Sequence, residues 1–219
     1  MNNQLLLHFL SELEQNNNKE WMDAHRDWYH QAKEEFQNFV HFLLGEMSVV
    51  DEGLLGLQPK DCIFRINRDI RFSKNKSPYK NNFGVFMSEG GKKSPNAGYY
   101  LHIQPGNESF IGGGMYHPES DALSKVRQEI DYNAGELKEI TSQKAFKKYF
   151  DTIQGEKLKR APKGYQPDHP NIELLKLKDF VVIHKLQDEE LVKENFGYKT
   201  IQIFKAMEPF VHYLNVAIS

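Results

Sequence analysis

The sequence predicts an α+β protein with a mostly antiparallel sheet of about five strands, flanked by N-terminal and C-terminal helices. Three observations support this prediction. Apolar residues recur at helical spacing near both ends of the chain. Between the ends, short segments alternate apolar and polar residues, which is typical of half-buried strands. The central segments are joined by links of hairpin length, so neighbouring strands are expected to pair antiparallel.

The N-terminal part predicts two helices. Apolar residues between Leu5 and Leu13 mark one face of a short helix, and Asn16-Asn17-Asn18 forms a turn that can cap the next helix. Apolar and aromatic residues then keep helical spacing from Trp21 to Met47. An aromatic stripe of this regularity indicates a helix that faces the core rather than a ligand site.

The segment Phe64–Gly84, which we call the basic stretch, follows these helices. Its first half predicts a strand, because its apolar residues share one register: Phe64, Ile66, Ile70 and Phe72. Arg68 falls on the same register, so we expect it to be the most buried arginine here and to depend on a carboxylate partner. Arg71 falls on the other register and is expected to be freer to meet a ligand. The composition of Ser73–Asn82 is that of a connecting loop.

Four more strands are expected after this loop. They begin near Phe83, Tyr99, Ser109 and Lys178. Glu89–Asn96 contains Gly, Lys, Ser and Pro without an apolar anchor, so it is expected to be an exposed and poorly ordered loop. Helical spacing returns after Pro118 and again after Leu191, and Pro209 is expected to kink or interrupt the last helix.

Composition favours an ordinary globular protein made of a single domain, residues 1–219. Hydrophobic residues make up 39% and charged residues 26% of the chain. The lone Cys62 cannot form an internal disulfide, and the N-terminal sequence has no basic leader and only a short apolar run. We therefore expect a cytoplasmic protein with no membrane association.

The charges are unevenly distributed. Residues 65–80 carry six bases and one acid, a net +5, and residues 157–163 carry four bases and no acid. Since the formal charge of the whole chain is −2, the remaining residues together carry −11. An acidic body with two local basic segments argues against a nucleic-acid-coating domain and favours a small anionic ligand. Binding of a confined piece of nucleic acid stays open.

Arginine forks and lysine ammonium groups are the side chains that bind phosphate. If the basic strand lies near Tyr99–Gln104, its polar residues share a sheet face with Tyr100 and His102. Gly113, in a run of three glycines before Tyr116-His117-Pro118, would let backbone N–H groups approach an anion, although such a run can equally mark a strand bulge or close helix packing. His102 and His117 could meet if the strands pair as expected. The candidate ligand-binding residues are Arg65, Asn67, Arg68, Arg71, Lys74, Lys80, Tyr100 and Gly113, and the candidate acid–base residues are His102 and His117.

Several chemistries have no support in the sequence. There is no HExxH or paired CxxC motif for a metal, and no GxSxG turn for a serine hydrolase. No motif identifies a cofactor or a partner protein. The histidines are scattered, and each one alone is more typical of a hydrogen-bonded structural residue than of a ligand.

Six segments carry a resemblance to a known family. These are NNNKEW, RINRDIRFSKNKSPYKNNFG, YYLHIQPG, GGGMYHP, LKRAPKGY and DHP, which together span nearly the whole chain. With these motifs the chain resembles domain of unknown function family 2461. Met22 departs from the pattern, because an aromatic residue is expected after Trp21. The resemblance implies no established activity.

Two hypotheses about function remain open at the level of sequence. In the first, the basic stretch forms a concave site that binds a phosphate-bearing small molecule or nucleotide, with or without acid–base chemistry. In the second, the protein is a non-enzymatic structural or protein-interaction domain, and the basic stretch is an internal clamp of ion pairs.

Overall fold

The computed structural model describes residues 2–219. The N-terminal part forms α1 (Asn3–Gln15), α2 (Lys19–Ala24), α3 (Arg26–Met47), the 3-10 helix η1 (Glu52–Leu54) and α4 (Pro59–Cys62). Three strands follow: β1 (Phe83–Met87), β2 (Gly98–Ile103) and β3 (Phe110–Met115). The C-terminal part contains α5 (Ser120–Ser142), α6 (Lys144–Lys147), α7 (Ile172–Leu175), β4 (Phe180–Lys185), α8 (Asp188–Leu191) and α9 (Phe196–Ile218).

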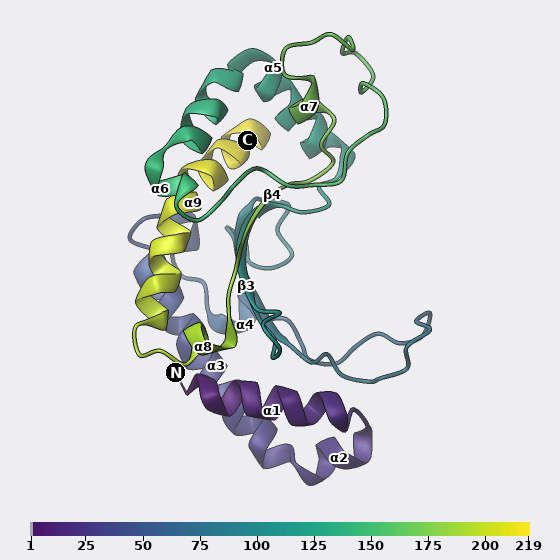
Figure 1. Ribbon diagram of the computed structural model, residues 1–219, viewed down its shortest axis with the longest axis vertical. Coiled ribbons are helices and arrows are strands. Elements are labelled where there is room, and N and C mark those ends of the chain that lie inside the picture. Colours follow the sequence, from purple (N-terminus) through teal and green to yellow (C-terminus); the bar gives the residue numbers. More distant parts are fainter. Residues whose placement is uncertain (1) are drawn as a thin grey trace.

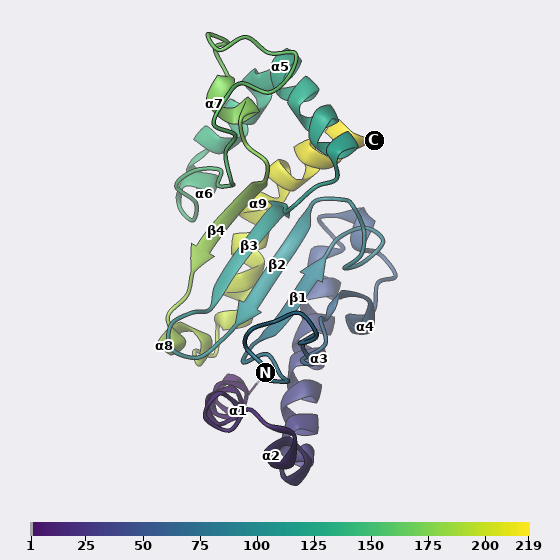
Figure 2. The ribbon, with the colours of Figure 1, turned by 90° about the vertical axis from the view of Figure 1, so that its right-hand side faces the viewer.

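The four strands form one antiparallel sheet in the order β1-β2-β3-β4. Helices α3 and α9 cover one face of this sheet, and the other face is open toward the viewer in Figure 2. The covered face is apolar because alternate residues of each strand point to it. Tyr99, for example, is fully buried, and its ring lies 5.4 Å from that of Phe204 in α9.

The expectation of an α+β protein with an antiparallel sheet and helices at both ends is confirmed, but the sheet has four strands instead of about five. The missing strand is the first half of the basic stretch. Only Ile63 and Phe64 lie beside β1, through a bridge to Val85 and a hydrogen bond from Phe64 N to Gly84 O. The chain then leaves the sheet, and Phe72, expected on the buried register, is 95% exposed.

The N-terminal helices are largely as expected. Asn18 caps α2 by accepting a hydrogen bond from Trp21 N at 2.8 Å. The long apolar stripe is divided between two helices, because the chain breaks at His25 before α3 begins. At the other end of the chain, α9 continues through Pro209, so the expected interruption does not occur.

The Glu89–Asn96 loop is held more closely than its composition predicted. Gly91 is buried beside Asp61, and Lys92 donates hydrogen bonds to Asp61 O from its backbone and to Lys60 O from its ammonium group. These contacts tie the loop to α4. Cys62 lies in the same helix, where burial raises the pKa of its thiol to about 11. It is therefore a core residue.

Among residues 2–219, no helix combines the length and the apolar character needed to cross a membrane.

Candidate functional site

The basic stretch forms an irregular loop that folds back on itself and projects from the sheet on its open side (Figure 1). Two backbone hydrogen bonds hold its two arms together. Arg68 N donates to Pro78 O and Lys80 N donates to Ile66 O, which makes an antiparallel bridge between Asn67 and Tyr79. The polar side chains of the stretch are therefore presented by a small hairpin and not by a strand of the sheet.

Two residues near the α1–α2 turn fix this hairpin to the body of the protein. The Asn17 side chain donates to Tyr79 O and accepts from Tyr79 N, both at 3.1 Å, so its amide imitates the pairing of a neighbouring strand. Glu14 accepts a hydrogen bond from Asn81 at 2.8 Å. The sequence pattern of Asn16–Asn18 predicted only a turn and a cap, because a contact across 62 residues leaves no local signal.

A polar cavity of about 370 Å³ lies between this turn and the hairpin. It is lined by Glu14, Asn17, Arg68, Asn75, Ser77, Tyr79, Lys80, Asn81 and Asn82. Two cations thus face one carboxylate, and that carboxylate already accepts the bond from Asn81. The remaining lining groups are mostly amides and hydroxyls, which donate hydrogen bonds to anions.

Arg68 is the more buried of the two central arginines, as expected, but the ion pair expected of it belongs to Arg71. Arg68 is half-buried, but among residues 2–219 it forms no ion pair; its guanidinium donates to Ser77 O at 3.1 Å and to Ser73 Oγ at 3.4 Å. Arg71 is exposed and grips Asp69 with two hydrogen bonds, at 2.9 and 2.6 Å. This pairing raises the pKa of Arg71 and lowers the pKa of Asp69. The guanidinium whose charge is not paired is that of Arg68.

Lys80 connects the cavity with the open face of the sheet. It lines the cavity, and its Nζ lies 5.6 Å from the centre of the Phe64 ring. Burial, and then the nearby charge of Arg65, lower the pKa of Lys80. Lys80 and Arg65 form no ion pair among residues 2–219, and their like charges repel each other, so an anion bound beside Lys80 would offset this repulsion.

Tyr100 and His102 lie on the open face, as expected. His102 Nδ1 is 3.1 Å from the Tyr100 hydroxyl and Nε2 is 2.9 Å from Gln104 Oε1. One neutral tautomer satisfies both contacts, with Nε2–H donating to Gln104 and Nδ1 accepting from Tyr100. Burial lowers the pKa of His102, and the charge of Lys80 adds to this effect. Burial also raises the pKa of Tyr100 to about 12.

The structure brings together only part of the expected set. Lys80, Tyr100 and His102 are neighbours, and Arg65 is close enough to Lys80 to affect its pKa. Asn67 is exposed and belongs to the hairpin, because the segment that carries it has left the sheet. Arg71 is engaged by Asp69, and Lys74 is exposed near the tip of the hairpin.

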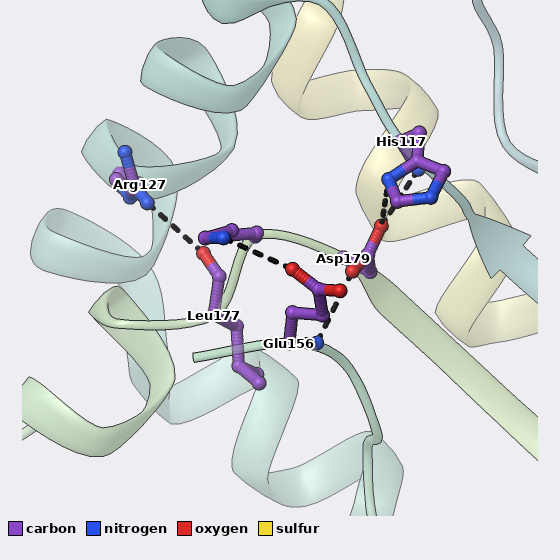
Figure 3. A network of polar contacts seen from close by, with 6 residues as sticks. His117, Arg127, Glu156, Leu177 and Asp179 are labelled. Atoms are coloured by element: carbon purple, nitrogen blue, oxygen red, sulfur yellow. Dashed lines mark hydrogen bonds and ion pairs between the residues drawn. The ribbon is translucent and has the colours of Figure 1, made fainter. Parts of the chain in front are cut away.

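His117 does not meet His102. His102 opposes Phe110 at the start of β3, whereas His117 follows the end of that strand, about 20 Å away at the usual rise per residue. The buried carboxylate of Asp179 accepts hydrogen bonds from His117 N at 2.7 Å and from Glu156 N at 3.1 Å (Figure 3). His117 Nδ1 lies 3.3 Å from the same carboxylate, and its φ of 48° is in the left-handed region. This arrangement is a junction of three chain segments.

Gly113 does not face the open side, so its backbone is not presented to a ligand there. A Cβ at this position would lie 2.3 Å from Met207 Sδ and 2.8 Å from Gly98 O. The glycine therefore allows α9 to pack closely on β3, which was the alternative explanation of the glycine run. The cavity residues Glu14 and Asn17 were missed by sequence reasoning.

Two further features of residues 2–219 bear on the site. No group of three or more His, Cys, Asp and Glu side chains is placed to hold a metal ion within this part of the chain. A second hollow, of about 380 Å³, lies between α3 and α4 and has a single cation, Lys60, in its lining. The cavity beside the basic stretch has two cations in its lining, and its one carboxylate, Glu14, gives it the same net formal charge of +1.

A family model described as "Conserved hypothetical protein (DUF2461)" matches residues 5–213. No curated protein and no solved structure matches the chain.

Proposed function

The chain belongs to the DUF2461 family of conserved hypothetical proteins, whose description names no activity, and we propose that its cavity beside the basic stretch binds a phosphate-bearing small molecule or nucleotide. The phosphate would lie between Arg68 and Lys80. The observation that carries the proposal is the half-buried Arg68 guanidinium, which lines a polar cavity without a carboxylate partner among residues 2–219. A desolvated guanidinium gains most from a ligand that supplies the missing negative charge.

The size and lining of the cavity support the same ligand class. Its volume of about 370 Å³ lies in the range of small-molecule sites. Its amides and hydroxyls could donate to phosphate oxygens, while a base or sugar could extend toward the ring of Phe64 and the open face. Lys80 has a lowered pKa, and an incoming anion is expected to raise it.

We propose His102 as the residue that would carry out any acid–base chemistry at this site. Both ring nitrogens are hydrogen bonded, so a proton would reach a ligand through the Tyr100 hydroxyl. His117 is a separate candidate, because its exposed imidazole and the buried Asp179 form a second pair at the far end of β3. The cytoplasmic location is also part of the proposal and is supported by the single, buried thiol of Cys62.

A thermal-shift screen with inorganic phosphate, nucleoside monophosphates and sugar phosphates tests the proposal, because a bound ligand raises the melting temperature by mass action. We expect at least one phosphate ester to stabilise the protein. Arg68→Gln should weaken its binding by about 10- to 100-fold, the usual range for a lost charge-assisted hydrogen bond. The matched control Lys144→Gln, which removes one exposed charge from α6, should leave the affinity unchanged.

Two results would contradict the proposal. One is the absence of stabilisation by every phosphate-bearing compound, and the other is equal affinity of the Arg68→Gln variant and the unaltered protein. The second result would favour the structural alternative. The structural alternative stays open; the ion pair of the basic stretch, Arg71–Asp69, joins two residues of the stretch itself and does not clamp it to the body.

A further inference from the structure

The open face of the sheet carries a group of aromatic side chains. Strand alternation places Phe86, Tyr100, His102 and Phe110 on this face, and all four are half-buried, whereas their neighbours on the covered face are fully buried. Phe86 opposes Tyr100 and His102 opposes Phe110, so the four residues form two adjacent cross-strand pairs. The His102 and Phe110 rings are stacked at 4.8 Å. We call these four residues the aromatic platform.

Two glycines lie beside the aromatic platform in the sheet. Gly84 opposes His102, and Gly112 opposes Tyr100, so these two aromatic residues each have a cross-strand neighbour without a side chain. The Tyr100 hydroxyl and the Phe64 ring lie over Gly84. The face is also bordered on two sides. Helices α5 and α7 lie beyond one end of the strands and α1 and α2 beyond the other, which makes this side of the molecule concave (Figure 1).

The two basic segments of the chain lie at opposite ends of this face. The basic stretch leads into β1 at Phe83, which opposes Ile103 beside the aromatic platform. Residues 157–163 begin at the other end of the sheet, because Lys157 pairs with Leu177 just before β4. The ends are about 20 Å apart at the usual rise of a six-residue strand. Both loops project on the open side (Figure 1).

We infer that the open face binds a short segment of single-stranded nucleic acid, with bases on the aromatic platform and backbone phosphates at the two basic segments. Sheets that present aromatic rings on an open face stack unpaired bases, and cations along the path hold the backbone. Along the sequence, the two basic segments in an acidic chain argued against a nucleic-acid-coating domain, because nothing in the sequence placed them on one face. The structure places these segments, whose net formal charges are +5 and +4, at the two ends of one face, and Lys157 of the second segment is paired with Glu173.

A single strand suits this face better than a duplex. Aromatic rings can stack only on bases that are unpaired and splayed out. The inference rests on the proposed phosphate site, since Arg68 and Lys80 would hold the phosphate at one end. It adds the aromatic platform and the distant segment 157–163, which a mononucleotide bound at Arg68 would not reach.

Fluorescence anisotropy with labelled oligothymidylates of different length tests the inference and separates it from the proposed function. A dodecanucleotide should bind at least about tenfold more tightly than a mononucleotide, because it gains stacking and a second set of phosphate contacts. A duplex of the same length should bind more weakly than the single strand. Mononucleotide binding without any gain for the longer strand would overturn the inference and leave the proposed function intact. Failure of both ligands would overturn both.

Two variants locate the contacts. Lys159→Gln/Arg160→Gln removes two exposed charges from the distant segment and should reduce the salt dependence of dodecanucleotide binding, by about 0.7 in the log–log slope for each lost phosphate contact. Its mononucleotide affinity should not change. The control Lys144→Gln/Lys147→Gln makes the same charge change on α6, on the helix-covered side (Figure 1), and should leave the slope unaltered. Equal slopes for the two double variants would overturn the inference.

A third variant tests stacking. Phe110→Leu removes the ring and keeps an apolar side chain, and it should weaken dodecanucleotide binding by about tenfold, whereas Phe110→Tyr should retain it. Tyr198→Leu, which removes an exposed ring from α9, is the control. If Phe110→Leu binds the dodecanucleotide as tightly as the unaltered protein does, the nucleic acid is held by charge alone. The inferred role of the aromatic platform would then be overturned.

Discussion

His102 illustrates how burial fixes the state of one side chain. Its two ring nitrogens contact Tyr100 and Gln104, and the neutral imidazole satisfies both contacts. Burial lowers its pKa and the charge of Lys80 acts in the same direction, while the hydrogen bond to Gln104 and the charge of Glu108 oppose them. Protonation of the imidazole would turn the Tyr100 hydroxyl from donor to acceptor and place a charge in a half-buried site.

This arrangement predicts a pH dependence of stability. Because the pKa of His102 is lower in the folded protein than in the unfolded chain, the unfolded chain binds the proton more readily as the pH falls below about 6.5. The free energy of unfolding should therefore decrease between pH 7 and pH 5. His102→Gln should show a smaller decrease, which urea denaturation at several pH values would measure. Identical pH profiles would show that His102 does not contribute.

The arginines of the basic stretch show what the sequence can and cannot predict about single residues. Composition identified the six cations correctly, but their roles were assigned from strand register. Since the segment leaves the sheet after Phe64, register no longer determines burial. Asp69 lies two residues from Arg71 and pairs with it locally, whereas Arg68 turns into the hairpin toward Ser77.

Among the elements, β3 shows most directly how glycine permits packing. Its central glycines let α9 approach the sheet so closely that no Cβ fits at position 113. Gly113→Ala should destabilise the protein by about 1–3 kcal/mol, the usual cost of overpacking a rigid core. Chemical denaturation measures this cost, with loss of the folded state as the extreme result.

Gly135 provides the matched control. It lies in α5, and nothing would lie within 4 Å of a Cβ added there. Gly135→Ala should therefore stabilise the protein by up to about 1 kcal/mol through helix propensity. If both alanine variants change the free energy of unfolding equally, the close approach of α9 is not the reason for glycine at position 113.

The elements were predicted with unequal success, and the basic stretch explains why. Long helices and the hairpin-linked strands carry strong periodic signals, so α1, α3, β2 and α9 were all expected. The alternation of Phe64–Phe72 is equally regular, yet the segment forms a hairpin held by the Asn17 amide and by its own backbone. A segment with a period of two forms a strand only where a neighbouring strand provides backbone hydrogen-bonding partners. Between this segment and β1, the pairing is limited to the bridge at Ile63.

At the scale of the whole molecule, charge and shape combine in a way that the sequence did not predict. The positions of the two basic segments were evident, as was the acidic remainder of the chain. Their placement at opposite ends of one open face depends on the order of the strands and on the loop between α6 and α7 (Figures 1 and 2). The cavity at Arg68 likewise requires the α1–α2 turn to meet the hairpin across 62 residues.

Nuclear magnetic resonance of the arginine Nε–H groups tests the central claim most directly, because each guanidinium reports its own environment. The protein would be titrated with adenosine monophosphate and, separately, with inorganic phosphate. We predict a saturable shift of the Arg68 Nε–H resonance with little change at Arg71, whose Nε already donates to Asp69. A shift confined to Arg71, or equal weak shifts of every exposed arginine, would contradict an anion site at Arg68.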